Sequence, residues 1–184
     1  PTYTSVSRLA EAEIFTYDLT EEGGWEPDFD ALERLPLERI KLMWVNYPHM
    51  PTGKCASQSL FARLVDFGKR HNIVIVNDNP YSFILNDNPL SILCVPGAKD
   101  IAIEMNSLSK SHNMPGWRVG MIAANPQFIQ WILKVKSNID SGQFKHLMLA
   151  ASKALECDKE WYDGVNKTYA SRRLIAEDIM RALG

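Results

Sequence analysis

The sequence predicts an α/β fold in which a mainly parallel sheet carries helices on both faces. Short apolar runs rich in β-branched residues alternate along the chain with longer amphipathic stretches, as in repeated strand–helix units. Several of the short runs are apolar throughout, which is typical of strands covered from both sides. With 184 residues, 46% of them hydrophobic and 23% charged, the chain can bury one sizeable core.

The composition argues against some classes of partner. A net charge of −2 gives no reason to expect nucleic acid or an anionic membrane surface. No apolar run approaches the roughly 20 residues of a membrane span, and no basic-then-apolar signal peptide is visible. The three cysteines form no paired motif and the histidines lack metal-ligand spacing. We therefore expect no disulfide framework, no metal site and a reducing, cytoplasmic setting.

The first 71 residues are expected to contain two strands and one long helix. The alternating pattern of residues 13–19 predicts the first strand, and the continuous apolar run 40–45 predicts the second. The stretch 56–71 predicts an amphipathic helix. Its buried stripe is expected to consist of Leu60, Phe61, Leu64, Val65 and Phe67. Shorter expected elements are a helix end over 5–12, a turn over 21–24 and a helix over 28–35 that Pro36 ends.

The rest of the chain is expected to contain three more strands and three helices. The strands are predicted over 73–76, 101–105 and 119–124, with a loop over 86–99. The helices are predicted from 125 to the break at 140–142, over 144–157 and over 159–183. The first of these helices is expected to turn Phe128, Ile129, Ile132, Leu133 and Val135 inward.

One loop places reactive side chains between two of the predicted strands. It runs over residues 107–120 and carries Ser107, Ser109, Lys110 and Arg118. Hydroxyl groups donate hydrogen bonds to an anion, and a guanidinium offers a planar fork that matches phosphate oxygens. A lysine amine beside such an anion is a candidate for covalent carbonyl chemistry.

The predicted topology brings other polar residues to the same place. Asn46, Asp78 and Lys110 each come just after a predicted strand. In open parallel sheets, ligands bind beyond the carboxyl ends of the strands. The sequence therefore predicts a binding site at that edge.

The string Ser-Leu-Ser-Lys-Ser-His-Asn-Met-Pro-Gly-Trp-Arg-Val-Gly, residues 107–120, resembles the cofactor-lysine signature of fold-type I, class I/II pyridoxal-phosphate aminotransferases. Its details are most similar to the aspartate, alanine and LL-diaminopimelate group. The resemblance implies that Lys110 holds the cofactor covalently and moves the substrate proton. It also implies that Ser107, Ser109 and Arg118 bind the cofactor phosphate.

The same resemblance gives roles to Asp78 and Tyr81, which match the family's Asp-x-x-Tyr. A carboxylate opposite the pyridine nitrogen keeps the ring protonated, which makes it an electron sink. The tyrosine hydroxyl would bond the phenolic oxygen of the ring. In isolation, the segment 77–80 is better explained as a plain turn, because Asn and Asp cap backbone groups readily; Lys110 and Arg118 at the expected places reverse this preference.

Further residues are possible neighbours of the cofactor or substrate. The loop around Pro51 resembles the family's Asn-Pro-Thr-Gly element, but Met50 stands where the asparagine would be, and a thioether is only a weak acceptor. Either Tyr81 alone holds the phenolic oxygen, or Asn46 or His49 compensates; His49 reads equally as an ordinary loop residue.

Two more positions are hypotheses. Trp117 is a candidate wall of the phosphate pocket. Ser141 belongs to an Asp-Ser-Gly segment that lies near the active site in the family, often across the dimer interface. A plain helix break explains that segment as well.

The family's enzymes are about twice as long as this chain. We therefore expect residues 1–158 to form the central part of the cofactor-binding large domain, and residues 159–184 to lead toward a smaller domain. The upstream glycine-rich turn, the aromatic residue stacked on the cofactor and the substrate-binding arginine have no counterpart here. The chain alone is expected to be inactive. The whole protein is expected to be a homodimeric enzyme that acts on a small amino acid and a 2-oxo acid. The alternatives are a β-lyase or synthase of the same fold, a cofactor-sensing regulator, and a degenerate homologue marked by Met50.

Overall fold

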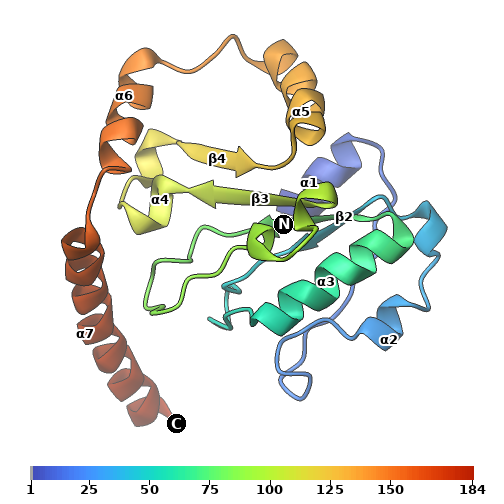
Figure 1. Cartoon of the computed structure of the whole chain (residues 1–184). Helices are drawn as coiled ribbons and strands as arrows, with labels where there is room; N and C mark the ends of the chain where they lie inside the picture. Colours follow the sequence, from blue (N-terminus) through green and yellow to red (C-terminus); the bar gives the residue numbers. More distant parts are fainter. Residues whose placement is uncertain (1) are drawn as a thin grey trace.

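The computed structural model describes residues 2–184, and its centre is a four-stranded sheet in the order β1-β2-β3-β4 (Figure 1). Strands β1 (Leu42–Val45), β2 (Val74–Asp78) and β3 (Ala102–Ser107) are parallel neighbours. Strand β4 (Gly120–Ala123) returns antiparallel to β3. The prediction of a mainly parallel α/β sheet is confirmed.

Helices connect and flank these strands. They are α1 (Thr2–Leu9), α2 (Phe29–Leu32), α3 (Gln58–His71), α4 (Leu108–Ser111), α5 (Pro126–Ile139), α6 (Lys145–Ala154) and α7 (Lys159–Leu183). Short 3-10 turns are η1 (Leu37–Arg39), η2 (Ile92–Cys94), η3 (Ala98–Asp100) and η4 (Pro115–Trp117). The long helices predicted over 56–71 and 159–183 are confirmed.

Helix α3 covers one face of the sheet. Ser57 caps its start by accepting the Leu60 N–H at 3.0 Å, and Asn72 ends it in the left-handed conformation. The predicted apolar stripe is buried in full and packs on Met43, Val45, Ile75 and Ala102. A side chain at Gly68 would meet the Ile73 carbonyl at 2.7 Å, so the glycine lets helix and sheet approach closely.

The opposite face is covered by α5 and α1, which confirms the prediction of helices on both sides. Residues that alternate with the first core set, among them Val76 and Ile103, pack against Phe128 and Ile132 of α5. The Tyr3 ring of α1 stacks on Trp44, with centroids 4.8 Å apart.

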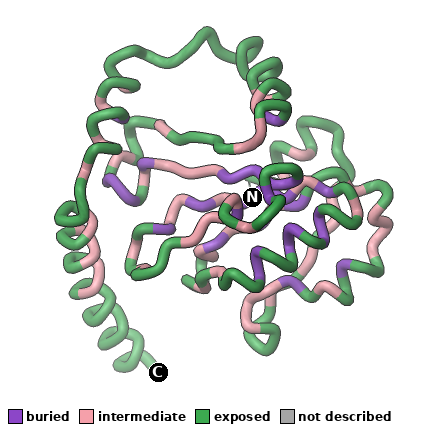
Figure 2. The backbone as a smooth tube through the Cα atoms, in the orientation of Figure 1, coloured by how far each residue is buried: buried purple, intermediate pink, exposed green. Residues whose placement is uncertain are grey.

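The α5 stripe is less buried than the sequence predicted. Leu133 and Val135 are 54% and 61% exposed, so their predicted inward positions are wrong. Figure 2 shows the same contrast: buried residues concentrate in α3 and the parallel strands, whereas α5, α6 and α7 are mostly exposed.

The strand predicted over residues 13–19 is also wrong. This segment is extended but pairs with no strand of the described sheet. Its alternating pattern arises because Tyr17 packs against the α3 core and donates its hydroxyl to the Trp44 carbonyl at 2.6 Å. The helix predicted over 28–35 is shortened to a single turn, which Asp28 caps.

Candidate functional site

The carboxyl edge of the parallel strands gathers the predicted site residues. Asp78 is the last residue of β2 and pairs with Met105, and Ser107 ends β3 two residues further on. Ser107 pairs with Gly120, the first residue of β4, which places the preceding Arg118 at this edge too. The register thus brings the carboxylate, the lysine loop and the arginine to one end of the sheet.

Asp78 has a hydrogen-bond donor in place. The Tyr3 hydroxyl donates to Asp78 Oδ2 at 2.6 Å, while its ring stacks on Trp44. Burial, followed by the bond to Asp78, raises the pKa of the Tyr3 hydroxyl, so it remains a protonated donor. Sequence reasoning missed Tyr3, because nothing local marks a contact that spans 75 residues.

Lys110 and Tyr81 come together from different loops. The Lys110 Nζ lies 5.9 Å from the centroid of the Tyr81 ring. Lys110 is exposed and, within residues 2–184, has no carboxylate at ion-pair distance. Its amine is therefore available to a ligand at this edge.

The two serines organise the turn that carries Lys110. Ser107 is the N-cap of α4, and its Oγ accepts the Ser109 backbone N–H at 3.1 Å. The two hydroxyl oxygens lie 3.0 Å apart. Both side chains are half-buried, so their hydroxyls face the same small region beside the lysine.

The return strand fixes the position of Arg118. The Leu108 N–H donates to the Val119 carbonyl at 3.2 Å, and a side chain at Gly120 would meet the Asn106 carbonyl at 2.9 Å. Arg118 adopts a left-handed backbone with φ of 55°, and its guanidinium donates to the Pro115 carbonyl at 2.8 Å. The guanidinium is exposed and has further N–H groups for an anion.

The loop after β1 contributes one direct contact. Asn46 Nδ2 donates to the backbone carbonyl of Asp78 at 2.6 Å, and Asn46 Oδ1 accepts the Met50 N–H at 2.9 Å. His49 bonds Thr52 through Nδ1 at 2.8 Å, and burial lowers its pKa. Asn46, rather than His49, therefore touches the segment that carries Asp78, and the Met50 side chain is 57% exposed.

Trp117 and Ser141, the other two hypothesised neighbours of the cofactor, take no part in the hydrogen bonds described above. Trp117 lies in η4 and is 45% exposed. Ser141 lies in the exposed loop between α5 and α6, which arches away from the sheet (Figure 1). In the described part of the chain, neither contacts Asp78, Lys110 or the two serines.

A buried polar cluster behind the edge was also missed. Glu104 is only 7% exposed and accepts hydrogen bonds from the Asn79 amide and the Ser91 hydroxyl. Asn106 Nδ2 donates to the Asn79 carbonyl at 2.7 Å. These bonds hold the turn that follows Asp78 in a single conformation. Each partner comes from a different segment, so no local pattern could reveal the cluster.

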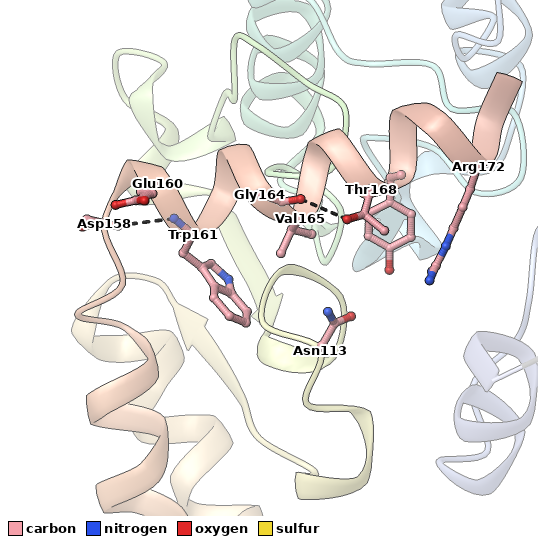
Figure 3. Close-up of a pocket in the computed structure, with 9 residues that line it drawn as sticks. Asn113, Asp158, Glu160, Trp161, Gly164, Val165, Thr168 and Arg172 are labelled. Atoms are coloured by element: carbon pink, nitrogen blue, oxygen red, sulfur yellow. Dashed lines mark hydrogen bonds between the residues drawn. The ribbon is translucent and has the colours of Figure 1, made fainter.

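The predicted residues lie outside the one sizeable pocket found among residues 2–184, which is itself open to solvent. A cavity of about 510 Å³ runs along α7, between Asn113 and the face that bears Trp161 and Arg172 (Figure 3). Asp78 and Lys110 do not line it. Among residues 2–184, no three His, Cys, Asp or Glu side chains gather as a metal site requires. No helix in that range combines the length and apolar character needed to cross a membrane.

Asp78, Lys110 and Arg118 thus lie at the carboxyl edge of a parallel sheet, which is the edge where open α/β sheets bind ligands. The sequence pattern described as "Aminotransferase class I and II" matches residues 1–184. The chain belongs to this family.

Several relatives resemble the chain along its whole length. It is 38% identical to the LL-diaminopimelate aminotransferase of Aquifex aeolicus and 41% identical to that of Gloeobacter violaceus. These matches cover 100% of this chain and 48% and 47% of the two relatives. The chain thus spans about half the length of these curated relatives.

Solved structures share the fold. BacF of Bacillus subtilis matches with a TM-score of 0.88 and 36% identity, over 92% of this chain and 44% of that one. A probable N-succinyldiaminopimelate aminotransferase of Thermus thermophilus matches with a TM-score of 0.91 and 29% identity, over 99% of this chain and 49% of that one.

Proposed function

We propose that the protein with this sequence works as a pyridoxal-phosphate-dependent aminotransferase, moving an amino group between a small amino acid and a 2-oxo acid. The observation that carries the proposal is the meeting of Asp78, Lys110 and Arg118 at one edge of the sheet, in a chain of the class I and II aminotransferase family. Because the chain spans about half the length of its relatives, the proposal concerns the whole protein.

The side chains at this edge fit the pyridine ring of such a cofactor. Asp78 Oδ2 already accepts a hydrogen bond from the Tyr3 hydroxyl, and a protonated ring nitrogen is a donor of the same kind. The Lys110 amine is exposed within reach of the Tyr81 ring. Asp78 would hold the ring nitrogen, Lys110 would hold the cofactor covalently, and Tyr81 would bond its phenolic oxygen.

The phosphate would be held by the loop around Lys110. The Ser107 and Ser109 hydroxyls lie 3.0 Å apart, and Arg118 comes two residues before Gly120, which pairs with Ser107. Hydroxyl donors combined with a charged guanidinium are a strong combination for phosphate oxygens. These three residues are the proposed phosphate ligands.

Pyridoxal phosphate, when bound, supplies an electron sink for the carbon bond that the reaction breaks. The chain supplies the proton handling. A neutral Lys110 Nζ accepts a proton and returns it as a general base and then a general acid, which contributes typically 10²–10⁴-fold in rate. The Asp78 carboxylate would favour the protonated state of the ring nitrogen.

The relatives narrow the proposed substrates and setting. The relatives from Aquifex aeolicus and Gloeobacter violaceus are called LL-diaminopimelate aminotransferases, and the Thermus thermophilus structure is called a probable N-succinyldiaminopimelate aminotransferase. We therefore propose an amino donor of the aspartate, alanine or LL-diaminopimelate group, and a biosynthetic role. A cytoplasmic location and a homodimeric assembly complete the proposal.

The test is an absorption spectrum of the intact protein with pyridoxal phosphate, together with amino transfer from a panel of amino acids to 2-oxoglutarate. We expect the wild type to show the absorption band of a covalently bound cofactor, and Lys110→Ala to lack it. Amino transfer should fall at least about 10²-fold in Lys110→Ala. The exposed Lys145→Ala is the matched control and should retain both.

Two results would contradict the proposal. One is an unchanged band and unchanged turnover in Lys110→Ala. The other is release of pyruvate from β-substituted amino acids without any amino acceptor, which would identify a β-lyase of the same fold.

Asp78→Asn should keep the covalent attachment but lose turnover, because the amide is a poorer partner for a protonated ring nitrogen.

A further inference from the structure

Helix α7 contacts both loops that carry the proposed cofactor residues, although none of its residues is buried. Trp161 and Tyr162 contact the end of α4, whereas Tyr162 and Asn166 contact the loop after β2. Figure 1 shows that loop reaching toward α7, and Figure 3 shows Trp161 pointing toward the loop that holds Asn113.

The contact with the lysine loop runs through His112, two residues after Lys110. Its ring is 5% exposed, with Nδ1 2.8 Å from Ser111 Oγ and Nε2 3.2 Å from the Tyr162 hydroxyl. Burial lowers the pKa of His112, so a neutral ring links the two hydroxyls with one donor and one acceptor nitrogen. The Trp161 indole donates to the Ser111 carbonyl at 3.1 Å.

The contact with the other loop runs through Asn166. Its Oδ1 accepts the Leu85 N–H at 2.8 Å, and its Nδ2 donates to the Phe83 carbonyl at 3.0 Å. Leu85 has a φ of 47°, which a leucine rarely adopts, so the amide holds a turn that the sequence does not favour. The Tyr162 ring packs on Phe83 at 5.2 Å, two residues after Tyr81.

We propose that Tyr162 and Asn166 form a brace that sets the separation between Tyr81 and Lys110. The two brace residues are four apart, so they lie on one face of a rigid helix. One end of the brace fixes the lysine loop and the other fixes the tyrosine loop, where Lys110 Nζ stands 5.9 Å from the Tyr81 ring. The brace residues are positioning residues. This inference rests on the proposed function in one respect only, namely that Lys110 is the lysine that holds the cofactor.

The test measures the reactivity of Lys110 without any cofactor. The intact protein is treated with trace acetic anhydride, and acetylation of Lys110 is compared by mass spectrometry with that of the exposed Lys99 and Lys145. Asn166→Ala should let the tyrosine loop move away. The aromatic face then no longer attracts the ammonium, and relative acetylation of Lys110 should rise about two- to fivefold.

A double-mutant cycle separates positioning from general loosening. In a Tyr81→Leu background, where the ring is already gone, Asn166→Ala should have no further effect on Lys110. The matched control is Ser171→Ala, which removes a hydrogen bond of α7 to the Thr168 carbonyl that reaches neither loop. This control should leave Lys110 acetylation unchanged.

Three outcomes would overturn the brace. They are an unchanged acetylation of Lys110 in Asn166→Ala, an equal rise in both backgrounds, and an equal rise in Ser171→Ala. If Asn166→Ala does not fold by far-ultraviolet circular dichroism, Asn166→Asp decides, because it keeps the acceptor for Leu85 and loses the donor to Phe83. A missing cofactor band would refute the proposed function and leave this measurement intact.

Discussion

Helices α3 and α5 are both 14 residues long and lie on opposite faces of one sheet, yet they are packed to very different degrees. Helix α3 buries Leu60, Phe61, Leu64, Val65, Phe67 and Gly68. Helix α5 buries Phe128 alone, while Trp131 and Ile139 remain 57% and 77% exposed. Stability should therefore reside on the α3 side of the sheet.

The comparison also separates two kinds of information in an apolar stripe. The stripe identifies a helix in both cases, and in α3 it also identifies the buried face, whereas Leu133 and Val135 of the α5 stripe are exposed. How far the stripe is covered depends on what lies opposite. Helix α3 packs against residues of all three parallel strands. Strand β4, which precedes α5 in the chain, is exposed along its whole length.

The largest contrast is expected from phenylalanine truncation. Phe61→Ala, at a site 1% exposed in α3, should lower the free energy of unfolding by about 3–5 kcal/mol. Phe144→Ala, at a site 64% exposed before α6, should change it by less than about 1 kcal/mol. Urea unfolding followed by circular dichroism measures both, and similar losses would show that the two regions are equally packed.

A glycine pair should give effects of opposite sign. Gly68→Ala in α3 forces a methyl group against the Ile73 carbonyl at 2.7 Å and should cost about 1–3 kcal/mol. Gly164→Ala in α7 meets no atom within 4 Å and should stabilise by up to about 1 kcal/mol through helix propensity. Urea midpoints that move in the same direction for both variants would contradict the packing described for α3.

Helix caps should sharpen the contrast further. Ser57→Ala removes the cap of α3 and should lower the global unfolding free energy by about 1 kcal/mol. Asp158→Ala removes the cap of α7, whose residues are all outside the core, and should increase amide hydrogen exchange in α7 with little change in global stability. A global loss from Asp158→Ala would show that α7 unfolds together with the sheet.

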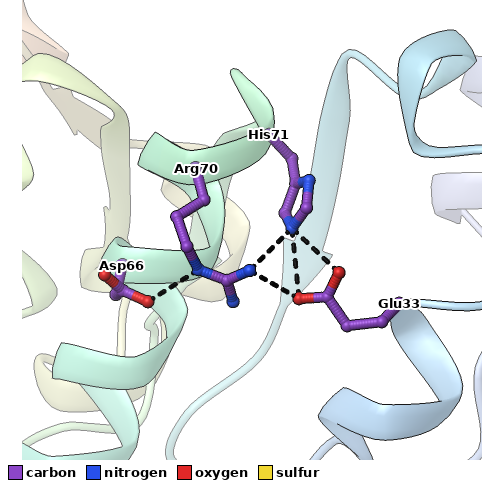
Figure 4. Close-up of polar contacts among 4 residues, drawn as sticks. All are labelled: Glu33, Asp66, Arg70 and His71. Carbon is purple, nitrogen blue, oxygen red and sulfur yellow. Dashed lines mark hydrogen bonds and ion pairs between the residues drawn. The ribbon is translucent and has the colours of Figure 1, made fainter.

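The smallest effect concerns a surface cluster at the end of α3. Glu33 accepts from Arg70 at 2.7 Å, and Arg70 also bonds Asp66 at 2.9 Å (Figure 4). The bonds from Arg70 and then His71 lower the pKa of Glu33 below its ordinary 4.5. The stabilisation is therefore present above about pH 4.5 and lost as pH falls through the lowered pKa.

Glu33→Gln tests this linkage. The wild-type advantage in urea midpoint should be seen at pH 6 and shrink as the pH falls below about 4.5, and added salt should reduce it because the groups are exposed. An advantage of the same size at every pH would assign the effect to packing instead.

The sequence predicted those features that depend on neighbouring residues. The α3 stripe, the α7 range and the lysine loop follow from periodicity, capping residues and a continuous motif. Residues 13–19 failed because a segment packed beside a sheet shows the same alternation as a strand within it.

The parts of the site that sequence reasoning missed depend on contacts between distant segments. Tyr3 reaches Asp78 across 75 residues, and Glu104 gathers partners from two loops. Neither contact leaves a pattern along the chain. Asn46 was among three alternatives, and only the structure separates it from His49 by its bond to the Asp78 backbone.

Gly120 has an influence beyond its own position. Because Gly120 has no side chain, β4 can lie close to β3, and the Leu108 N–H can donate to the Val119 carbonyl, which joins the two ends of the lysine loop. The loop can then be altered at its tip without separating the serines from the arginine. A bulkier residue at 120 would meet the Asn106 carbonyl, push β4 away from β3 and break the hydrogen bond that joins the two ends of the loop.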